Sequence, residues 1–276
     1  MKKYGLIGKG ISGSDSPALF KAAYGGKFAY DLLDGKSFAP LFELFKKEYA
    51  AVNVTAPFKE EALAAADEAT DAALLCGAAN MLVKLPDGRI QADNSDFEGV
   101  TLSIMSAYAV ADVDVDDEDA FADFLADKTA LVIGCGGAGK AAAAAAVTLG
   151  YGRTILVNRT RERAVSLKNH LAEYYEDLTD DELEVRDFSR LGESFTEADL
   201  VILATSEPVV PDDIAAMPVN MGKLVLEASY ANSCLEQWKE KFTYISGLNW
   251  LYNQAVVAYE VFTGLEPDED EMKKVL

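Results

Sequence analysis

The sequence predicts an α/β protein of two domains, one of which has a Rossmann-like, doubly wound parallel sheet. Short apolar runs alternate with helical patterns along the 276 residues, which is typical of βα units. In the middle of the chain, the stretch TALVIGCGGAGK at 129–140 passes from an apolar run through glycines into an alanine-rich helix pattern. Strand, tight turn and helix follow there without a gap, as in dinucleotide-binding folds.

The first hundred residues are predicted to form an α/β domain of their own. Its strands and helices alternate and end in a hairpin around Leu85-Pro-Asp-Gly88, whose residues favour a turn. The expected strands are 4–8, 28–33, 51–55, 80–84 and 89–92, and the expected helices are 17–24, 38–49, one that begins near Phe58, and 97–110.

The alternation continues after residue 128. The expected strands are 129–133, 153–157, 183–186, 200–204 and 223–227, and the expected helices are 141–149, one that contains Arg163, 247–264 and a short acidic helix at the end. The acidic segment 112–127 is read as solvated surface that leads into the second domain.

The glycines of the central stretch predict a dinucleotide site. Gly134 permits the sharp turn, Gly136 lets the backbone approach a pyrophosphate, and Gly139 lets helix and strand pack closely. The phosphates would rest on the N–H groups at the helix N-terminus, where Gly137 and Ala138 also stand.

The residues after the next strand indicate NADP rather than NAD. An NAD-binding unit usually carries an acidic residue there for the ribose 2′-hydroxyl. This chain has Asn158-Arg159-Thr160, with Arg163 one turn into the following helix. Two guanidinium groups suit a 2′-phosphate, because they can form charged and often bidentate hydrogen bonds with it.

Composition argues against several classes of function. The net charge of −21 disfavours nucleic acid and membrane partners, since both require a basic footprint. The three cysteines are far apart and lack CxxC spacing, so neither a disulfide framework nor a metal site is expected. We expect a reducing, cytoplasmic compartment. Cys135, in the glycine loop, is read as a small apolar filler. Because His170 is the single histidine, proton transfer is expected from Lys, Asp, Glu or Tyr.

Three polar clusters stand where apolar residues would serve packing. The first is SGSDSP at 12–17, in which Ser16 is expected to cap the helix that begins with Pro17, leaving the other hydroxyls for a carboxylate. The second is NVTAPFK at 53–59, where polar residues alternate along an apolar strand before a lysine opens a helix. The third is DNSD at 93–96, where a turn would explain Asp93 and Asn94.

Together these motifs resemble the shikimate dehydrogenase family. The motifs follow its order: ISGSDSP, NVTAPFK, GAAN, DNSD, GCGGAGKA, NRTRERA, ATS and GLNWLYNQA, from Ile11 to Ala255. The resemblance implies a substrate-binding catalytic domain over 1–100, an NADP-binding Rossmann domain over 101–245, and C-terminal helices over 246–276 that pack toward the substrate domain. It also implies reversible, NADPH-dependent reduction of 3-dehydroshikimate to shikimate, a step of chorismate and aromatic amino acid biosynthesis.

Carried over by motif, the resemblance implies that Lys59 and Asp96 are the catalytic pair. Hydride arriving at a carbonyl carbon leaves negative charge on the oxygen, which an ammonium group can stabilise and protonate. Lys59 would act as general acid in reduction and general base in oxidation, with Asp96 orienting it. The implied substrate residues are Ser14, Ser16, Thr55, Asn80, Tyr230 and Gln254, and the implied cofactor residues are Gly134, Gly136, Gly137, Ala138, Gly139, Asn158, Arg159, Thr160, Arg163, Thr205 and Gly247.

Several residues depart from the family pattern and leave alternatives open. They are Phe58, Met81, Leu203, Glu207-Pro208 and Glu227, and Glu207-Pro208 stands where the reactive end of the cofactor is expected. One alternative is a quinate/shikimate dehydrogenase-like paralogue with broader substrate or NAD use. Another is a non-catalytic module that senses NADP or a metabolite. The sequence leaves open whether the protein is a monomer or a homodimer.

Overall fold

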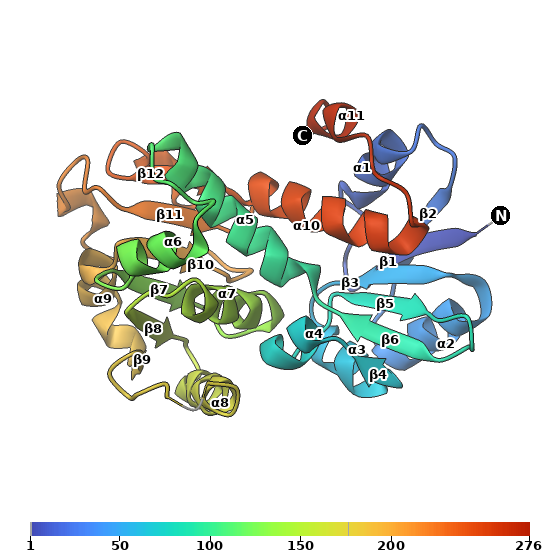
Figure 1. Cartoon of the computed structure of the whole chain (residues 1–276), viewed down its shortest axis with the longest axis horizontal. Helices are drawn as coiled ribbons and strands as arrows, with labels where there is room; N and C mark the ends of the chain where they lie inside the picture. Colours follow the sequence, from blue (N-terminus) through green and yellow to red (C-terminus); the bar gives the residue numbers. More distant parts are fainter. Residues whose placement is uncertain (1, 176) are drawn as a thin grey trace. The chain divides into compact units, whose positions relative to one another are not determined.

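The structure is a computed structural model that describes residues 2–175 and 177–276. The chain divides into two units, each with one six-stranded sheet (Figure 1). The first unit contains Met1–Gly99 and Leu251–Leu276, and the second contains Val100–Trp250. This division follows backbone contacts alone, and the predicted functional roles of the two domains stay predictions.

The sheet of the first unit mixes parallel and antiparallel strands in the order β2-β1-β3-β5-β6-β4. Strand β1 is parallel to β2 and β3, whereas β5 pairs antiparallel with β3 and β6, so the predicted hairpin is confirmed. The elements are β1 (Lys3–Gly8), α1 (Ser16–Ala23), β2 (Ala29–Asp34), α2 (Phe38–Glu48), β3 (Ala51–Val54), α3 (Lys59–Ala65), β4 (Glu68–Ala69), α4 (Asp71–Cys76), β5 (Met81–Lys84), β6 (Ile90–Asp93), α10 (Gly247–Thr263), which enters this unit at Leu251, and α11 (Glu269–Lys273).

The end of the chain completes the core of the first unit. Tyr259 and Phe262 of α10 are buried there with Tyr4 of β1 and Phe20 of α1. The rings of Tyr4 and Phe262 stack with their centroids 5.9 Å apart. The predicted return of the C-terminal helices to the N-terminal domain is therefore confirmed, and Figure 1 shows α11 beside α1.

The sheet of the second unit is parallel throughout, in the order β12-β11-β10-β7-β8-β9. Taken from β9 to β12, this is the doubly wound order 3-2-1-4-5-6 of dinucleotide-binding folds, which confirms the predicted fold class. The elements are α5 (Ser95–Val110), which begins in the first unit, α6 (Glu118–Leu125), β7 (Thr129–Ile133), α7 (Gly137–Thr148), β8 (Arg153–Val157), α8 (Arg161–Ala172), β9 (Leu183–Arg186), α9 (Leu191–Glu197), β10 (Leu200–Leu203), β11 (Leu224–Glu227) and β12 (Thr243–Ser246).

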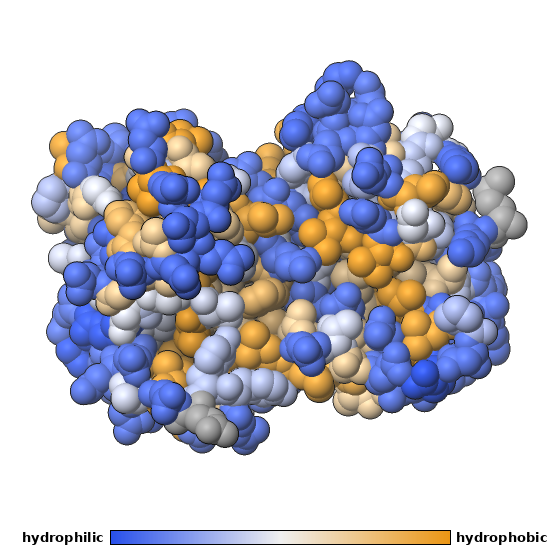
Figure 2. Space-filling view, viewed as in Figure 1, coloured by the Kyte–Doolittle hydropathy of each residue, from blue (hydrophilic) through white to orange (hydrophobic). Residues whose placement is uncertain are grey.

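The acidic segment 112–127 contains a helix that the sequence analysis did not predict. Helix α6 begins after Asp117, whose side chain accepts a hydrogen bond from the N–H of Ala120. The helix buries Phe121 and Leu125 and leaves its acidic residues in solvent, and Figure 2 shows hydrophilic residues over it. Among residues 2–175 and 177–276, no helix has both the length and the apolar character needed to cross a bilayer.

The turn between β7 and α7 depends on two glycines. Gly134 has a φ of +98°, in the left-handed region that favours glycine. A Cβ added to Gly139 would lie 1.7 Å from the carbonyl oxygen of Gly134, so the predicted close packing of helix on strand is confirmed. A Cβ added to Gly136 would meet nothing within 4 Å. The backbone itself therefore requires glycine at 134 and 139, but the space around Gly136 would accept a side chain.

We expect Gly139→Ala to lower the free energy of unfolding by about 1–3 kcal/mol or to prevent folding, because the added methyl group overlaps the Gly134 carbonyl. Gly136→Ala is the matched control, and its urea unfolding midpoint should stay close to that of the wild type. Equal midpoints for the two variants would contradict the packing argument.

Candidate active site

Lys59 and Asp96 form an ion pair in the first unit. Lys59 opens α3, Asp96 stands in the first turn of α5, and Nζ of the lysine donates to Oδ2 of the aspartate. Their side chains are only 12% and 6% exposed. The structure thus brings the two predicted catalytic residues together, as an amine and a carboxylate largely removed from water. Such a pair can hold and exchange a proton with a bound molecule.

A buried amide network lies next to Asp96 in the chain. Asn80, which is 2% exposed, donates from Nδ2 to Oε1 of Gln254 (2.8 Å) and to Oγ of Ser95 (3.1 Å). Its Oδ1 accepts the N–H of Ser95 at 2.8 Å. The network joins the start of β5, the start of α5 and the middle of α10, and it fixes the turn that carries Asp96. Two of the predicted substrate residues, Asn80 and Gln254, are therefore in direct contact.

Asp93 and Asn94 do more than form the predicted turn. Oδ1 of Asp93, at the end of β6, accepts from the hydroxyl of Thr70 (2.6 Å) and from the N–H of Asn94 (2.7 Å). Asn94 accepts the N–H of Phe97 (3.3 Å) and donates to the carbonyl oxygen of Ala78 (2.7 Å). These side chains end the strand, begin α5 and hold both to the segment before Asn80.

Ser16 does not cap α1, so the predicted capping role is wrong. It is the first residue of the helix, and the cap position belongs to Asp15, whose side chain makes no capping hydrogen bond. Instead, Oγ of Ser14 accepts the N–H of Ser16 (3.3 Å) and donates to its Oγ (3.1 Å). Two adjacent hydroxyls thus stand at a helix N-terminus, which is a suitable place for a carboxylate.

The remaining two predicted substrate residues lie on loops. Thr55 follows β3, and its N–H donates to the carbonyl oxygen of Ile7 (2.8 Å). Its own carbonyl oxygen accepts the N–H of Phe58 (3.1 Å). Tyr230 belongs to the second unit, in the segment after β11, where it is half-buried. Its role beside the other substrate residues stays a prediction.

Most departures from the family pattern are explained by packing. Phe58, Met81 and Leu203 are buried members of hydrophobic cores. Glu227 is 1% exposed, and its carboxylate accepts hydrogen bonds from the N–H groups of Cys234 and Leu235 and from the hydroxyl of Tyr244. Burial and the nearby Glu227 carboxylate raise the pKa of Tyr244, so that the hydroxyl remains a donor.

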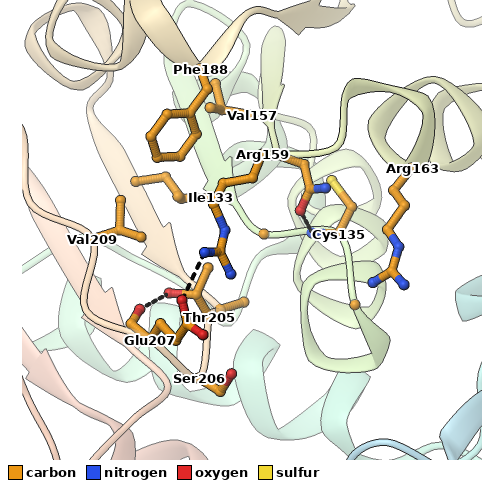
Figure 3. A pocket seen from close by; sticks show the side chains of 14 residues that line it. Ile133, Cys135, Val157, Arg159, Arg163, Phe188, Thr205, Ser206, Glu207 and Val209 are labelled. Carbon is orange, nitrogen blue, oxygen red and sulfur yellow. Dashed lines mark hydrogen bonds and ion pairs between the residues drawn. The ribbon is translucent and has the colours of Figure 1, made fainter.

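A pocket in the second unit opens at the carboxyl ends of β7, β8 and β10 (Figure 3). β7 and β10 are neighbours at the point where the strand order reverses, which is where open α/β sheets bind ligands. The predicted cofactor residues that line it are Gly134, Gly136, Asn158, Arg159, Arg163 and Thr205. The glycine loop and the basic segment therefore meet in one pocket.

The other five predicted cofactor residues lie outside the lining of this pocket. Gly137, Ala138 and Gly139 form the first turn of α7, where no side chain caps the N–H groups. Thr160 precedes α8 without a capping hydrogen bond. Gly247 opens α10, and a Cβ there would lie 2.4 Å from the carbonyl oxygen of Ala228. Close packing therefore explains why residue 247 is a glycine. The first turn of α7 presents N–H groups that suit a phosphate.

Asn158 and Cys135 have structural roles in the pocket. Oδ1 of Asn158 accepts the N–H of Cys135 (3.0 Å), and its Nδ2 donates to the carbonyl oxygen of Thr160 (2.8 Å). Asn158 thereby ties the end of β8 to the glycine loop. Burial raises the pKa of the Cys135 thiol to about 12, which fits the interpretation of this residue as an apolar filler.

The sequence analysis expected Glu207 at the reactive end of the cofactor, but the structure pairs it with Arg159, a predicted 2′-phosphate residue. Arg159 donates from Nη1 to Oε2 of Glu207 at 2.7 Å, and both side chains are largely exposed. Phe188 and Val209 add apolar surface to the pocket wall (Figure 3) and were not predicted from the sequence. Phe188 could have been found from its place just after the predicted strand 183–186, because ligands bind at that end of a parallel sheet. Within the described residues, no cluster of three or more His, Cys, Asp or Glu side chains is arranged to hold a metal ion.

Comparison with known proteins identifies relatives over nearly the whole chain. Residues 6–82 match the family described as shikimate dehydrogenase substrate binding domain, and residues 118–216 match shikimate / quinate 5-dehydrogenase. A shikimate dehydrogenase (NADP(+)) of Cereibacter sphaeroides is 30% identical over 97% of this chain and 93% of its own length.

Solved structures give the same result for the fold. A shikimate dehydrogenase in complex with NADP+ has a TM-score of 0.78 at 26% identity, over 100% of this chain and 94% of that one. A quinate dehydrogenase from Corynebacterium glutamicum in complex with NAD has a TM-score of 0.82 at 23% identity, over 99% and 98% of the two chains, which is a likeness of fold alone.

We expect Cys135 to resist alkylation by iodoacetamide at pH 8 in the folded protein. Its pKa of about 12 lies four units above that pH, so roughly one thiol in 10⁴ is the reactive thiolate. Labelling is measured by mass spectrometry, and protein unfolded in guanidinium is the control, in which Cys135 should label readily. Rapid labelling in the folded state would show that the glycine loop exposes a reactive thiol.

Proposed function

The chain belongs to the shikimate dehydrogenase family and is an NADP-dependent oxidoreductase of the shikimate pathway, and from this premise we propose that Lys59 and Asp96 carry its proton transfer. The reaction is the reversible reduction of 3-dehydroshikimate to shikimate, within chorismate and aromatic amino acid biosynthesis. The observation that supports the assignment is the shielded ion pair of Lys59 with Asp96, one residue from the amide network. That pair also argues against the alternative of a non-catalytic sensor.

In reduction, Lys59 acts as the general acid. Bound NADPH supplies the hydride, and negative charge then develops on the substrate oxygen. The Lys59 ammonium group stabilises this charge and gives its proton to the oxygen. Asp96 holds the ammonium group in place through its hydrogen bond. In the oxidation of shikimate, the neutral amine takes the proton back.

The substrate is held by hydroxyl and amide groups of the first unit. Ser14 and Ser16 bind the carboxylate, because their hydroxyls are adjacent at the N-terminus of α1. Thr55, Asn80 and Gln254 bind the ring hydroxyls. The network between Asn80 and Gln254 orients both amides before the substrate arrives. Tyr230 is assigned to the carboxylate from its motif.

The pocket of the second unit fits NADP. The uncapped first turn of α7, with Gly137, Ala138 and Gly139, and the open space over Gly136 suit a pyrophosphate. Arg159 and Arg163 suit the 2′-phosphate of the adenosine ribose. Asn158, Thr160 and Thr205 take part in hydrogen bonds within the loops around it. Gly247, where the carbonyl oxygen of Ala228 leaves no room for a side chain, completes the proposed set.

We propose a cytoplasmic location, because all three cysteines are free thiols, as is usual in a reducing compartment. The state of assembly, monomer or homodimer, stays a prediction. The proposed site binds small-molecule substrates as its partners.

We expect Lys59→Ala to lower kcat for shikimate oxidation by about 10²- to 10⁴-fold, because it removes the general base. NADPH binding, followed by nicotinamide fluorescence, should remain within about 2-fold of the wild type, since Lys59 lies outside the pocket of the glycine loop.

Lys3→Ala is the matched control, because Lys3 is an exposed lysine of the same unit that also pairs with a carboxylate, Glu48. It should keep wild-type turnover. A near-normal kcat in Lys59→Ala would show that Lys59 takes no part in the chemistry. If circular dichroism shows that Lys59→Ala is unfolded, the same measurement is made on Lys59→Arg.

A further inference from the structure

The carboxylate of Glu207 forms an ion pair with Arg159, the arginine proposed to bind the 2′-phosphate of the cofactor. Arg159 stands just after β8, and Glu207 lies in the loop after β10. Both line the same pocket, with Nη1 of Arg159 2.7 Å from Oε2 of Glu207. In Figure 3 the guanidinium group of Arg159 points toward Glu207, while Arg163 stands apart from that pair. The two loops thus place an internal anion at the predicted 2′-phosphate site.

A carboxylate and a phosphate use the same donors of an arginine. The guanidinium fork binds either of them through charged hydrogen bonds, so the 2′-phosphate has to displace Glu207 or share Arg159 with it. Displacement is feasible because the two side chains are 67% and 64% exposed, and exposed ion pairs are weak. Glu207 also adds negative charge where the dianionic phosphate must bind.

The carboxylate is not what holds the loop. The hydroxyl of Thr205 donates to the main-chain carbonyl oxygen of Glu207 (2.8 Å), a bond that any residue at 207 could accept. Pro208 fixes the backbone φ of the next position. Removing the charge of residue 207 should therefore leave the loop in place.

We propose that Glu207 competes with the 2′-phosphate of NADP(H) for Arg159 and thereby reduces the preference of this chain for NADP(H) over NAD(H). Glu207 is a specificity-determining residue that acts through Arg159. The inference rests on the proposed cofactor site, because it takes Arg159 as the 2′-phosphate ligand.

The test is the dissociation constant of each dinucleotide, measured by isothermal titration calorimetry on the full chain and on Glu207→Gln. Gln keeps the size of the side chain and removes its charge. We expect NADP+ to bind about 3- to 10-fold more tightly to Glu207→Gln and NAD+ to change less than about 2-fold. Adenosine 2′,5′-bisphosphate, which carries the 2′-phosphate, should bind more tightly to Glu207→Gln by the same factor as NADP+. The affinity for 5′-AMP, which lacks that phosphate, should not change.

Glu193→Gln is the control for general loss of negative charge, because Glu193 is an exposed carboxylate of the same unit that pairs with Arg190 outside the pocket. It should leave both dissociation constants unchanged. In an Arg159→Ala background, Glu207→Gln should lose its effect on NADP+.

Three results would overturn the inference. If Glu207→Gln binds NADP+ no more tightly than the wild type, Glu207 does not compete for Arg159. If 5′-AMP gains as much affinity as NADP+, the effect does not involve the 2′-phosphate. If Glu207→Gln still raises the affinity for NADP+ by the same factor in the Arg159→Ala background, Glu207 does not act through Arg159. These results leave the proposed function intact, whereas failure of NADP+ to bind either protein would overturn both together.

Discussion

The contact between Gly139 and the carbonyl oxygen of Gly134 is the constraint on which the glycine loop of the second unit depends. It brings the first turn of α7 against the end of β7, at the reversal of strand order. The uncapped first turn of α7 directly follows Gly136, which lines the pocket. The loop at Cys135 comes within reach of Asn158. The location of the proposed phosphate site thus depends on the absence of a side chain at one position.

In the first unit the corresponding constraint is the amide of Asn80. It bonds to residues of α5 and α10, two segments separated by more than half of the chain. Because a buried amide is costly to leave unsatisfied, these bonds fix the relative positions of the three segments. The proposed catalytic pair therefore lies next to a polar network, while the aromatic core around Tyr4 stabilises the remainder of the unit.

The features that the sequence predicts correctly are those encoded locally. Apolar runs and glycine spacing predict the long strands, the hairpin and the βα turn of the glycine loop, and the motif order predicts the neighbouring positions of Lys59 and Asp96. Elements that depend on tertiary pairing escape prediction. The strand β4 has only two residues and exists through its pairing with β6. The helix α9 has seven residues and β12 has four, which leaves little local pattern to predict them from. Helix α7 begins at Gly137 rather than at Ala141, because packing overrides the poor helix propensity of glycine. The meeting of Arg159 with Glu207, 48 residues apart, could not be predicted from either motif alone.

The first unit is assembled from two separated stretches of chain, and this fixes the order in which it can mature during synthesis. Its six strands leave the ribosome early, but the aromatic cluster of Tyr4 and Phe20 stays uncovered until Tyr259 and Phe262 have been translated. All residues of the second unit emerge in between. The nascent protein therefore carries an incomplete apolar surface throughout the synthesis of the second unit, and this surface is covered only when α10 and α11 pack onto it.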